Sequence, residues 1–163
     1  MKISRILFVL FSLLVSTQIK AQSPDASFRV ITVDYLTNKK IGGSYIHVYK
    51  KKKRITTLVT DSVGKVNFNL KLGSEYKIVV GADGKVDRFF YVDLKAAKKE
   101  SVQLSGICQI SLFEKKPNVD YSFVLENAIT RFYYESPKPN LEYEVESAMK
   151  MVKEIELIMK SQQ

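Results

Sequence analysis

The sequence is poor in the residues that disulfides, zinc sites and most nucleophilic catalytic sites require. Its 163 residues include one cysteine, one histidine and no tryptophan. The single cysteine, Cys108, excludes an intrachain disulfide and any cysteine-rich metal site, and the single histidine excludes the paired histidines of zinc peptidases. An apolar content of 45% is ordinary for a globular protein, so a wholly disordered or fibrous chain is excluded.

Motifs of nucleophilic catalysis and of phosphate binding are also absent. The chain has no Gly-x-Ser-x-Gly elbow, and Gly42-Gly43 is not followed by the Gly-Lys-Ser/Thr sequence of a phosphate loop. We expect His47 to lie on a strand surface and Cys108 to be a buried, structural thiol. The sequence therefore predicts a protein that is not an enzyme, with no catalytic residue, no cofactor and no metal site.

The first 21 residues have the three parts of a secretory signal peptide. Lys2 and Arg5 form a positive start, and a run of about ten mostly apolar residues follows, which is too short to cross a hydrocarbon core of ~30 Å. We expect cleavage after Ala21; the alternative is an uncleaved N-terminal anchor. The mature chain is then exported and not transmembrane. The periplasm is the expected compartment, and outer-membrane association and secretion are the alternatives.

Charge is unevenly distributed along the mature chain. Without Lys2, Arg5 and Lys20, 23 positive and 17 negative side chains remain, a net charge of +6. Residues 22–100 hold 16 positive and 8 negative groups, whereas residues 101–163 hold 7 and 9. This asymmetry predicts two structural units, a domain over residues 22–100 and an extension over residues 101–163.

Short apolar runs separated by turn residues predict a β-sandwich between about Ser27 and Leu94. Such runs, spaced by turns roughly every 8–12 residues, are typical of antiparallel sandwiches. Within one run, Ile46 and Val48 alternate with more polar residues, as in a strand with one buried face. We expect a mainly β fold with an antiparallel sandwich of about seven strands. The candidate strands cover residues 28–34, 45–49, 55–60, 65–70, 76–80 and 88–94.

Two segments of this region carry turn residues at characteristic positions. One is Asp34-Tyr-Leu-Thr37-Asn-Lys-Lys40-Ile41-Gly-Gly43-Ser44, and the other is Thr60-Asp61-Ser-Val-Gly64-Lys-Val66-Asn-Phe68-Asn-Leu70. Together they resemble carboxypeptidase regulatory-like domains, which belong to the transthyretin-like, prealbumin-like and Cna-B-like sandwiches. This chain departs from the family pattern at Asn38, Lys40 and Lys85, where the family has Gly, Pro and Tyr.

The resemblance covers roughly residues 27–95 and rests on turns and packing, so it implies a fold more strongly than a function. In that family the domain is normally non-catalytic and serves as an accessory or spacer module on exported proteins. The signal peptide ending in Ala21-Gln22 is also similar to those of exported Bacteroidetes proteins. The resemblance thus implies a Bacteroidetes-type envelope protein.

Beyond residue 100 we expect a small β extension and a C-terminal helix. The candidate strands cover residues 101–104, 107–113 and 128–134, and Asn140 is the expected N-cap of a helix over about residues 140–161. Apolar residues recur along one face of this helix. The face contains Leu141, Val145, Ala148, Val152, Ile155 and Met159, and Met149 and Ile158 widen it. Two interpretations are open: the face packs on the protein's own strands, or it docks on another protein.

Two surface features are further candidates for binding. Lys50, Lys51, Lys52, Lys53 and Arg54 place five positive charges at an expected hairpin tip, which would attract anionic lipid or lipopolysaccharide. Tyr45 and Tyr49 offer aromatic rings to a sugar or a protein partner, and further aromatic residues follow at 89–91 and 132–134. The simpler alternatives are a solvated hairpin that resists edge aggregation and ordinary aromatic packing.

The sequence thus predicts a non-enzymatic exported envelope protein that acts as a structural or protein-interaction module, an accessory subunit of a larger assembly. The expected partner is an envelope protein. The alternative is a module that binds a glycan or another envelope polymer through the exposed tyrosines and the basic hairpin tip. The basic tip could also attract nucleic acid, but the expected export and the absence of a recognition-helix or base-stacking pattern argue against a nucleic-acid partner.

Overall fold

The computed structural model describes residues 25–99 and 103–160, so the predicted signal peptide lies outside the described residues. The strands are β1 (Asp25–Asp34), β2 (Tyr45–Lys50), β3 (Lys53–Val59), β4 (Lys65–Lys71), β5 (Glu75–Gly81), β6 (Arg88–Asp93), β7 (Leu104–Leu112), β8 (Arg131–Tyr133) and β9 (Glu142–Tyr143). The helices are the 3-10 turn η1 (Ala96–Lys99), the short helix α2 (Ser122–Glu126) and the terminal helix α3 (Val145–Lys160).

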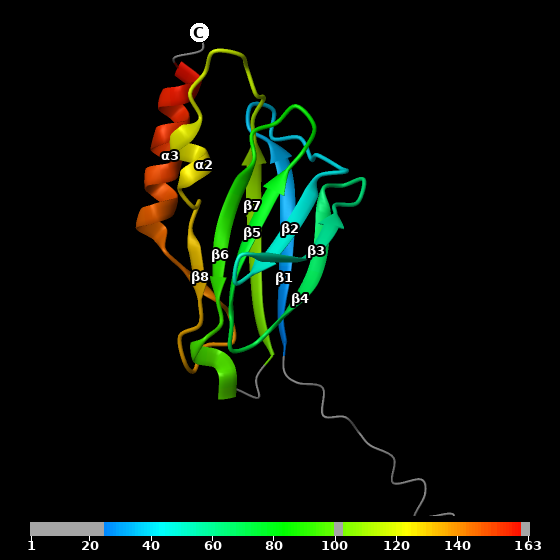
Figure 1. Ribbon diagram of the computed structural model, residues 1–163, viewed down its shortest axis with the longest axis vertical. Helices are drawn as coiled ribbons and strands as arrows, with labels where there is room; N and C mark the ends of the chain where they lie inside the picture. The colour runs from blue at the N-terminus through cyan, green and yellow to red at the C-terminus, as the bar shows by residue number, and fades with distance from the viewer. Residues whose placement is uncertain (1–24, 100–102, 161–163) are drawn as a thin grey trace, which may run out of the picture.

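The strands form two facing sheets, which confirms the predicted mainly β sandwich with a C-terminal helix (Figure 1). One sheet has the order β4-β1-β7 and the other has the order β3-β2-β5-β6-β8-β9. Alternation along the strands explains the layering: Ile46 and Val48 of β2 are buried, while the side chains between them point outward. The six-stranded sheet therefore has one face in the core and one face available to a ligand.

The sheets differ from a purely antiparallel sandwich at two places. β7 runs parallel to β1 over nine residue pairs, and β8 runs parallel to β6 over three. β7 is one continuous strand where two shorter strands were expected, although residues 101 and 102 lie outside the described part of the chain. Strands from both sides of residue 100 thus build one sandwich; a domain boundary at that residue stays a prediction.

Most apolar side chains lie in a core between the two sheets. Phe28, Phe90 and Phe132 meet at its centre, with ring centroids 5.1–5.6 Å apart. These rings come from β1, β6 and β8, so residues distant in the sequence close the core together. Aromatic contacts of this kind stabilise the fold beyond the area that they bury.

A second, smaller core lies between the helices and one end of the sandwich. Met151 and Ile155 of α3 pack there with Phe113, Tyr121 and Val124. Figure 1 shows α2 and α3 side by side along one flank of the sheets. α2 was not expected from the sequence, because a five-residue helix is too short to show a helical period.

The terminal helix begins later than its apolar spacing predicts. α3 starts at Val145, and Asn140 is not its N-cap, because Asn140 instead bridges to Ser105 at the edge of β7. Residues 142 and 143 form β9, so backbone pairing with β8 competes successfully with an extra helical turn. Within residues 25–99 and 103–160, none of the helices has the length and apolarity needed to span a bilayer.

Candidate functional site

The outer face of the six-stranded sheet brings together aromatic and basic side chains from four strands. Tyr49 of β2 pairs with Lys77 of β5, Lys77 with Tyr91 of β6, and Tyr91 with Arg131 of β8. Paired residues of neighbouring strands share a face, so these side chains form a row across the sheet. We call Tyr45, His47, Tyr49, Lys77, Phe89, Tyr91 and Arg131, which share this side of the sheet, the aromatic–basic face; Phe89 is buried within it.

Ring contacts order this face. The rings of Tyr45 and His47 stack with centroids 4.9 Å apart, and the rings of Phe89 and Tyr91 meet edge to face at 5.7 Å. The ammonium of Lys77 lies 3.8 Å from the centroid of the Phe89 ring, within the range of a cation–π interaction. This contact keeps the charge of Lys77 at the sheet surface.

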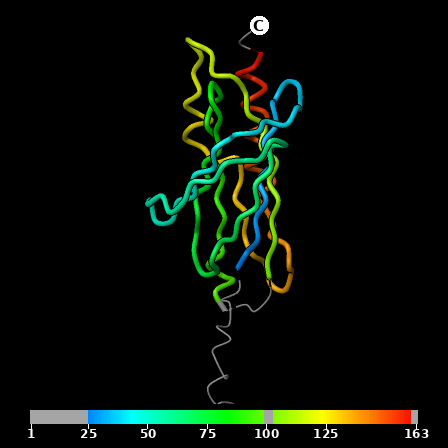
Figure 2. The backbone as a smooth tube through the Cα atoms, turned by 90° about the vertical axis from the view of Figure 1, so that its right-hand side faces the viewer, coloured from blue at the N-terminus to red at the C-terminus, as the bar shows by residue number. Residues whose placement is uncertain are grey.

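A hollow of about 570 Å³ opens between this face and the hairpin that joins β2 to β3. Its size is within the usual range of small-ligand sites. The tip of the hairpin projects from the body of the protein and is drawn in cyan in Figure 2. The hollow is lined by Tyr49, Lys51, Lys52, Glu75, Lys77, Val79 and Tyr91.

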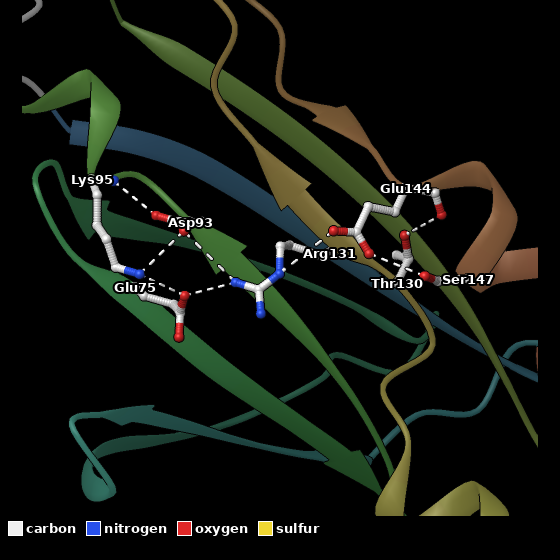
Figure 3. Close-up of polar contacts among 7 residues, drawn as sticks. All are labelled: Glu75, Asp93, Lys95, Thr130, Arg131, Glu144 and Ser147. Carbon is white, nitrogen blue, oxygen red and sulfur yellow. Dashed lines mark hydrogen bonds and ion pairs between the residues drawn. The ribbon is translucent and has the colours of Figure 1, made fainter.

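A network of ion pairs borders the hollow and partly neutralises its only acidic lining residue (Figure 3). Glu75 accepts hydrogen bonds from Lys95 at 2.8 Å and from Arg131 at 2.7 Å, which lower the pKa of its carboxyl group. Arg131 also lies 3.7 Å from Asp93 and 3.6 Å from Glu144. The lysines of the hollow therefore face a carboxylate whose charge is already partly compensated.

The two tyrosines that the sequence singled out differ in their surroundings. Tyr49 lines the hollow, whereas the hydroxyl of Tyr45 donates a hydrogen bond to Asp87 at the other end of β2. Burial and this bond raise the pKa of Tyr45 to about 12. Tyr49 is thus the better placed of the two to contact a ligand.

The five cations of the hairpin also separate. Lys51 and Lys52 line the hollow, and both have positive φ angles, 48° and 65°. Lys50 instead lies 5.7 Å from the ring of Tyr76, and Lys53 and Arg54 begin strand β3. An anionic ligand in the hollow would therefore contact Lys51 and Lys52, two of the five basic residues that the sequence predicted as anion contacts.

The predicted partner face of the terminal helix is divided between interior and surface. Leu141 precedes α3 and belongs to the core between the sheets, Ile155 is buried in the second core, and Met159 is half-buried. Val145 and Val152 are exposed, as is Met149, which is 68% exposed. The helix is thus rotated relative to the expected face, because Met151 takes the buried position beside Ile155.

The remaining candidates for chemistry have ordinary structural surroundings. Nδ1 of His47 lies 3.0 Å from the hydroxyl of Thr57 on the neighbouring strand. Cys108 is buried as expected, and burial raises the pKa of its thiol to about 12, so it carries no thiolate at neutral pH. In the part of the chain that the structure describes, no three His, Cys, Asp or Glu side chains are placed to hold a metal ion.

Sequence reasoning missed several residues of these surfaces. No local sequence pattern marks Glu75 and Lys77 of β5 or Arg131 of β8 as site residues. Their place beside the other residues of the site depends on strand register. The alternation of β6 could have separated Phe89 and Tyr91, which share the outer side of the sheet, from Phe90, which belongs to the core between the sheets, although Phe89 is itself buried. Met149, by contrast, was expected from the sequence to widen the apolar face of the helix, and it lies one helical turn from Val145.

Comparisons with known proteins concern the fold. No protein-family model matches the chain, and no curated protein matches it. Among solved structures, the chain is similar to the Bacillus anthracis TIE protein at 15% identity, covering 56% of this chain and 17% of that one, with a TM-score of 0.47. It is also similar to the pilus 2b backbone protein of group B streptococcus at 14% identity, covering 56% and 42%, with a TM-score of 0.44. These neighbours are consistent with the transthyretin-like β-sandwich that the turn motifs predict.

Enzymes are also among the similar structures. A catechol 1,2-dioxygenase of Acinetobacter radioresistens is 11% identical and covers 63% of this chain and 56% of its own, with a TM-score of 0.44. A 5-hydroxyisourate hydrolase of Klebsiella pneumoniae matches at 13% identity, covering 56% of this chain and 94% of its own, with a TM-score of 0.34. These findings contradict the prediction that the protein is not an enzyme. That prediction relied on the absence of catalytic motifs and on a family that is normally non-catalytic, whereas enzymes are among the proteins with a similar fold.

Proposed function

We propose that this chain is an exported structural or protein-interaction module that joins a larger assembly of the cell envelope. Its docking element is an apolar strip on α3 made by Val145, Met149 and Val152. The occupant of the strip is a partner protein with an apolar groove. The observation that carries the proposal is the exposure of these three side chains beside a helix face that is already buried.

The spacing of the strip matches a known mode of recognition. Residues Val145, Met149 and Val152 stand at positions i, i+4 and i+7, so they share one side of the helix over about 10 Å. Helices that dock in apolar grooves present their anchors with this spacing. The adjacent side of α3, roughly 100° around the helix, packs on the second core through Met151 and Ile155, which holds the strip in a fixed orientation.

A second hollow extends the apolar strip at the C-terminal end of the helix. Its volume is about 570 Å³, and it has a mixed lining in which Met159, Phe113, Ile41 and Leu36 lie among the charged residues Asp34, Lys39, Lys40, Glu114 and Lys116. Leu36 is 74% exposed, so a partner would cover another large apolar side chain there. Phe113 is buried and Ile41 and Met159 are half-buried, so Leu36 is the exposed apolar residue that this hollow adds to the strip.

Site-directed photocrosslinking in the native cell envelope tests the proposal. A photoreactive amino acid replaces Met149 in one variant and Leu157 in another, and adducts are identified by mass spectrometry. Leu157 is a matched control, because it is on the same helix and 52% exposed but lies about 140° around the helix from Val152. We expect one stoichiometric protein adduct from position 149 and none from position 157.

A pair of charge substitutions gives the complementary result. Val152 and Leu157 are equally exposed at 52%, so Val152→Glu and Leu157→Glu should both leave the fold intact. We expect V152E to abolish capture of the crosslinked partner and L157E to retain it. Equal capture by both variants, or equal adducts from both crosslinking positions, would overturn the proposed docking strip.

A further inference from the structure

We propose that the hollow between the β2–β3 hairpin and the six-stranded sheet binds an acidic oligosaccharide, in which sugar rings carry carboxylate or phosphate groups. This site lies on the sheet and not on α3, so it goes beyond the protein-docking function proposed above. Three independent features support it: the charge of the hollow, the arrangement of its rings and the backbone of the hairpin tip.

The hollow is positively charged on two sides. Lys51 and Lys52 line it from the hairpin tip, and Lys77 lines it from the sheet. Neither Lys51 nor Lys52 forms an ion pair with any of residues 25–99 or 103–160. Glu75 pairs with Lys95 and Arg131, as Figure 3 shows, and these cations, which Asp93 shares, offset part of its charge, so the three lysines outweigh it. The ligand that complements this site is therefore an anion.

The rings of the hollow favour a ligand with flat apolar faces as well as charge. Tyr49 and Tyr91 line the hollow from β2 and β6, with Lys77 of β5 in register between them. Neighbouring strands are about 4.8 Å apart, which places the two tyrosines roughly 10 Å apart across the sheet. Two sugar rings separated by one further sugar can stack on the two aromatic rings, while the acidic group of the sugar between them meets the lysine. A lipid headgroup or an acidic peptide supplies the negative charge but does not offer several flat ring faces to the two tyrosines. An acidic oligosaccharide therefore matches the hollow better.

The third feature is the backbone conformation of the hairpin tip. Lys51 and Lys52 occupy the left-handed region, with φ angles of 48° and 65°, as the two central residues of a hairpin turn. Such a turn strongly prefers Asn-Gly, because other residues are strained with positive φ. Strained residues cluster at sites where their side chains have a function. We infer that the two lysines are present for their charge and at the expense of the stability of the turn.

One double substitution should raise or preserve the thermal stability of the protein while it lowers the affinity for the ligand. The double substitution Lys51→Asn with Lys52→Gly supplies the preferred turn residues and removes both charges. We expect its thermal unfolding midpoint to equal or exceed that of the unaltered protein. Its affinity for the ligand should fall by at least about tenfold, the effect of losing roughly 1.4 kcal/mol of interaction.

Isothermal titration calorimetry with defined probes measures the affinity. The probes are a tetragalacturonate, a phosphorylated oligosaccharide, neutral maltotetraose, vesicles containing phosphatidylglycerol and a polyglutamate peptide. We expect binding of one or both acidic oligosaccharides, weakening as salt screens the charges, and no binding of maltotetraose. Comparison of the first two probes shows whether the acidic group is a carboxylate or a phosphate.

Two further variants separate this site from nonspecific charge. Tyr49→Ala removes one ring and should also weaken binding, whereas Lys65→Gln with Lys153→Gln removes two exposed charges elsewhere and should not. The proposal is overturned if no acidic oligosaccharide binds, or if the vesicles or the peptide bind equally well. It is also overturned if K51N/K52G retains full affinity. None of these results depends on the docking strip of α3.

Discussion

Asp34 shows at the scale of one residue how a turn motif is held. Its Oδ1 accepts hydrogen bonds from the backbone of Leu36 and from both the backbone and the hydroxyl of Thr37, at 2.9–3.1 Å. Its Oδ2 accepts a bond from Lys85 at 2.8 Å. The bond from Lys85, followed by those from Thr37, lowers the pKa of Asp34 to about 2. Asn38 then takes a φ of 55°, which explains why the resembling family has glycine there.

Asp34→Asn should destabilise the protein by about 1–2 kcal/mol at pH 7, because the charge-assisted bond to Lys85 is lost. The contribution of the carboxylate is fully present above its ordinary pKa of 3.8 and is lost as the pH falls toward about 2. Urea unfolding should thus show a difference between the two proteins that shrinks between pH 4 and pH 2. A double variant with Lys85→Met should lose little more than either single variant. A difference that does not change with pH would contradict this assignment.

The hairpin turn at Asp61 is a feature that the local sequence predicts reliably. Oδ1 of Asp61 accepts bonds from the backbone of Val63 and Lys65, and Gly64 has a φ of 71°, as the turn motif predicts. A Cβ at Gly64 would also lie 2.7 Å from the carbonyl oxygen of Thr32. Local sequence patterns could not identify Glu75 or Lys77 as site residues. Their neighbours lie on other strands, and only the strand register places those strands beside them.

At the scale of elements, Arg131 joins the three-residue strand β8 to its surroundings. Its guanidinium contacts Glu75 of β5 and lies 4.8 Å from the ring of Tyr91 of β6. Its backbone carbonyl accepts a bond from Glu144, the residue before α3, at 3.0 Å. Figure 3 shows this side chain between the sheet and the start of the helix. A short strand thus holds its place through a side chain as well as through backbone pairing.

Arg131→Met should lower the free energy of unfolding by about 1–2 kcal/mol and increase hydrogen exchange in β8 and at the start of α3. The effect is moderate because the guanidinium is one-third exposed. Lys138→Met is a suitable control, since Lys138 also pairs with two carboxylates but on an exposed loop, and it should leave the stability unchanged. Equal effects of the two substitutions would show that Arg131 has no special role in joining these elements.

At the scale of the whole molecule, the sandwich depends on β7. This strand supplies Leu104, Cys108, Ile110 and Leu112 to the core between the sheets and pairs with β1 over its whole length. Without it, β1 would be an edge strand, and the core side of β1, including Phe28, would be exposed. We therefore expect the strands that carry the family resemblance to be incomplete as a folding unit without β7.

A chain of residues 22–100 should consequently fail to fold, whereas a chain of residues 22–144 should keep the sandwich with reduced stability. The longer chain lacks Met151 and Ile155 of the second core, and each buried side chain of this type contributes about 1.5–3 kcal/mol. Circular dichroism during thermal unfolding distinguishes the two chains by the presence of a cooperative transition. A cooperative transition in the shorter chain would show that the predicted boundary at residue 100 separates an independent domain.

The sequence alone was sufficient for features with a local physical cause. Period-two alternation identified most strands, Asp61 and Gly64 identified a turn, and apolar spacing identified the terminal helix. Contacts between distant segments required the tertiary structure, because strand order and register are set by packing over the whole chain. Only the structure placed Tyr49, Lys77 and Tyr91 in one row, and only packing on the second core left Val145, Met149 and Val152 outside.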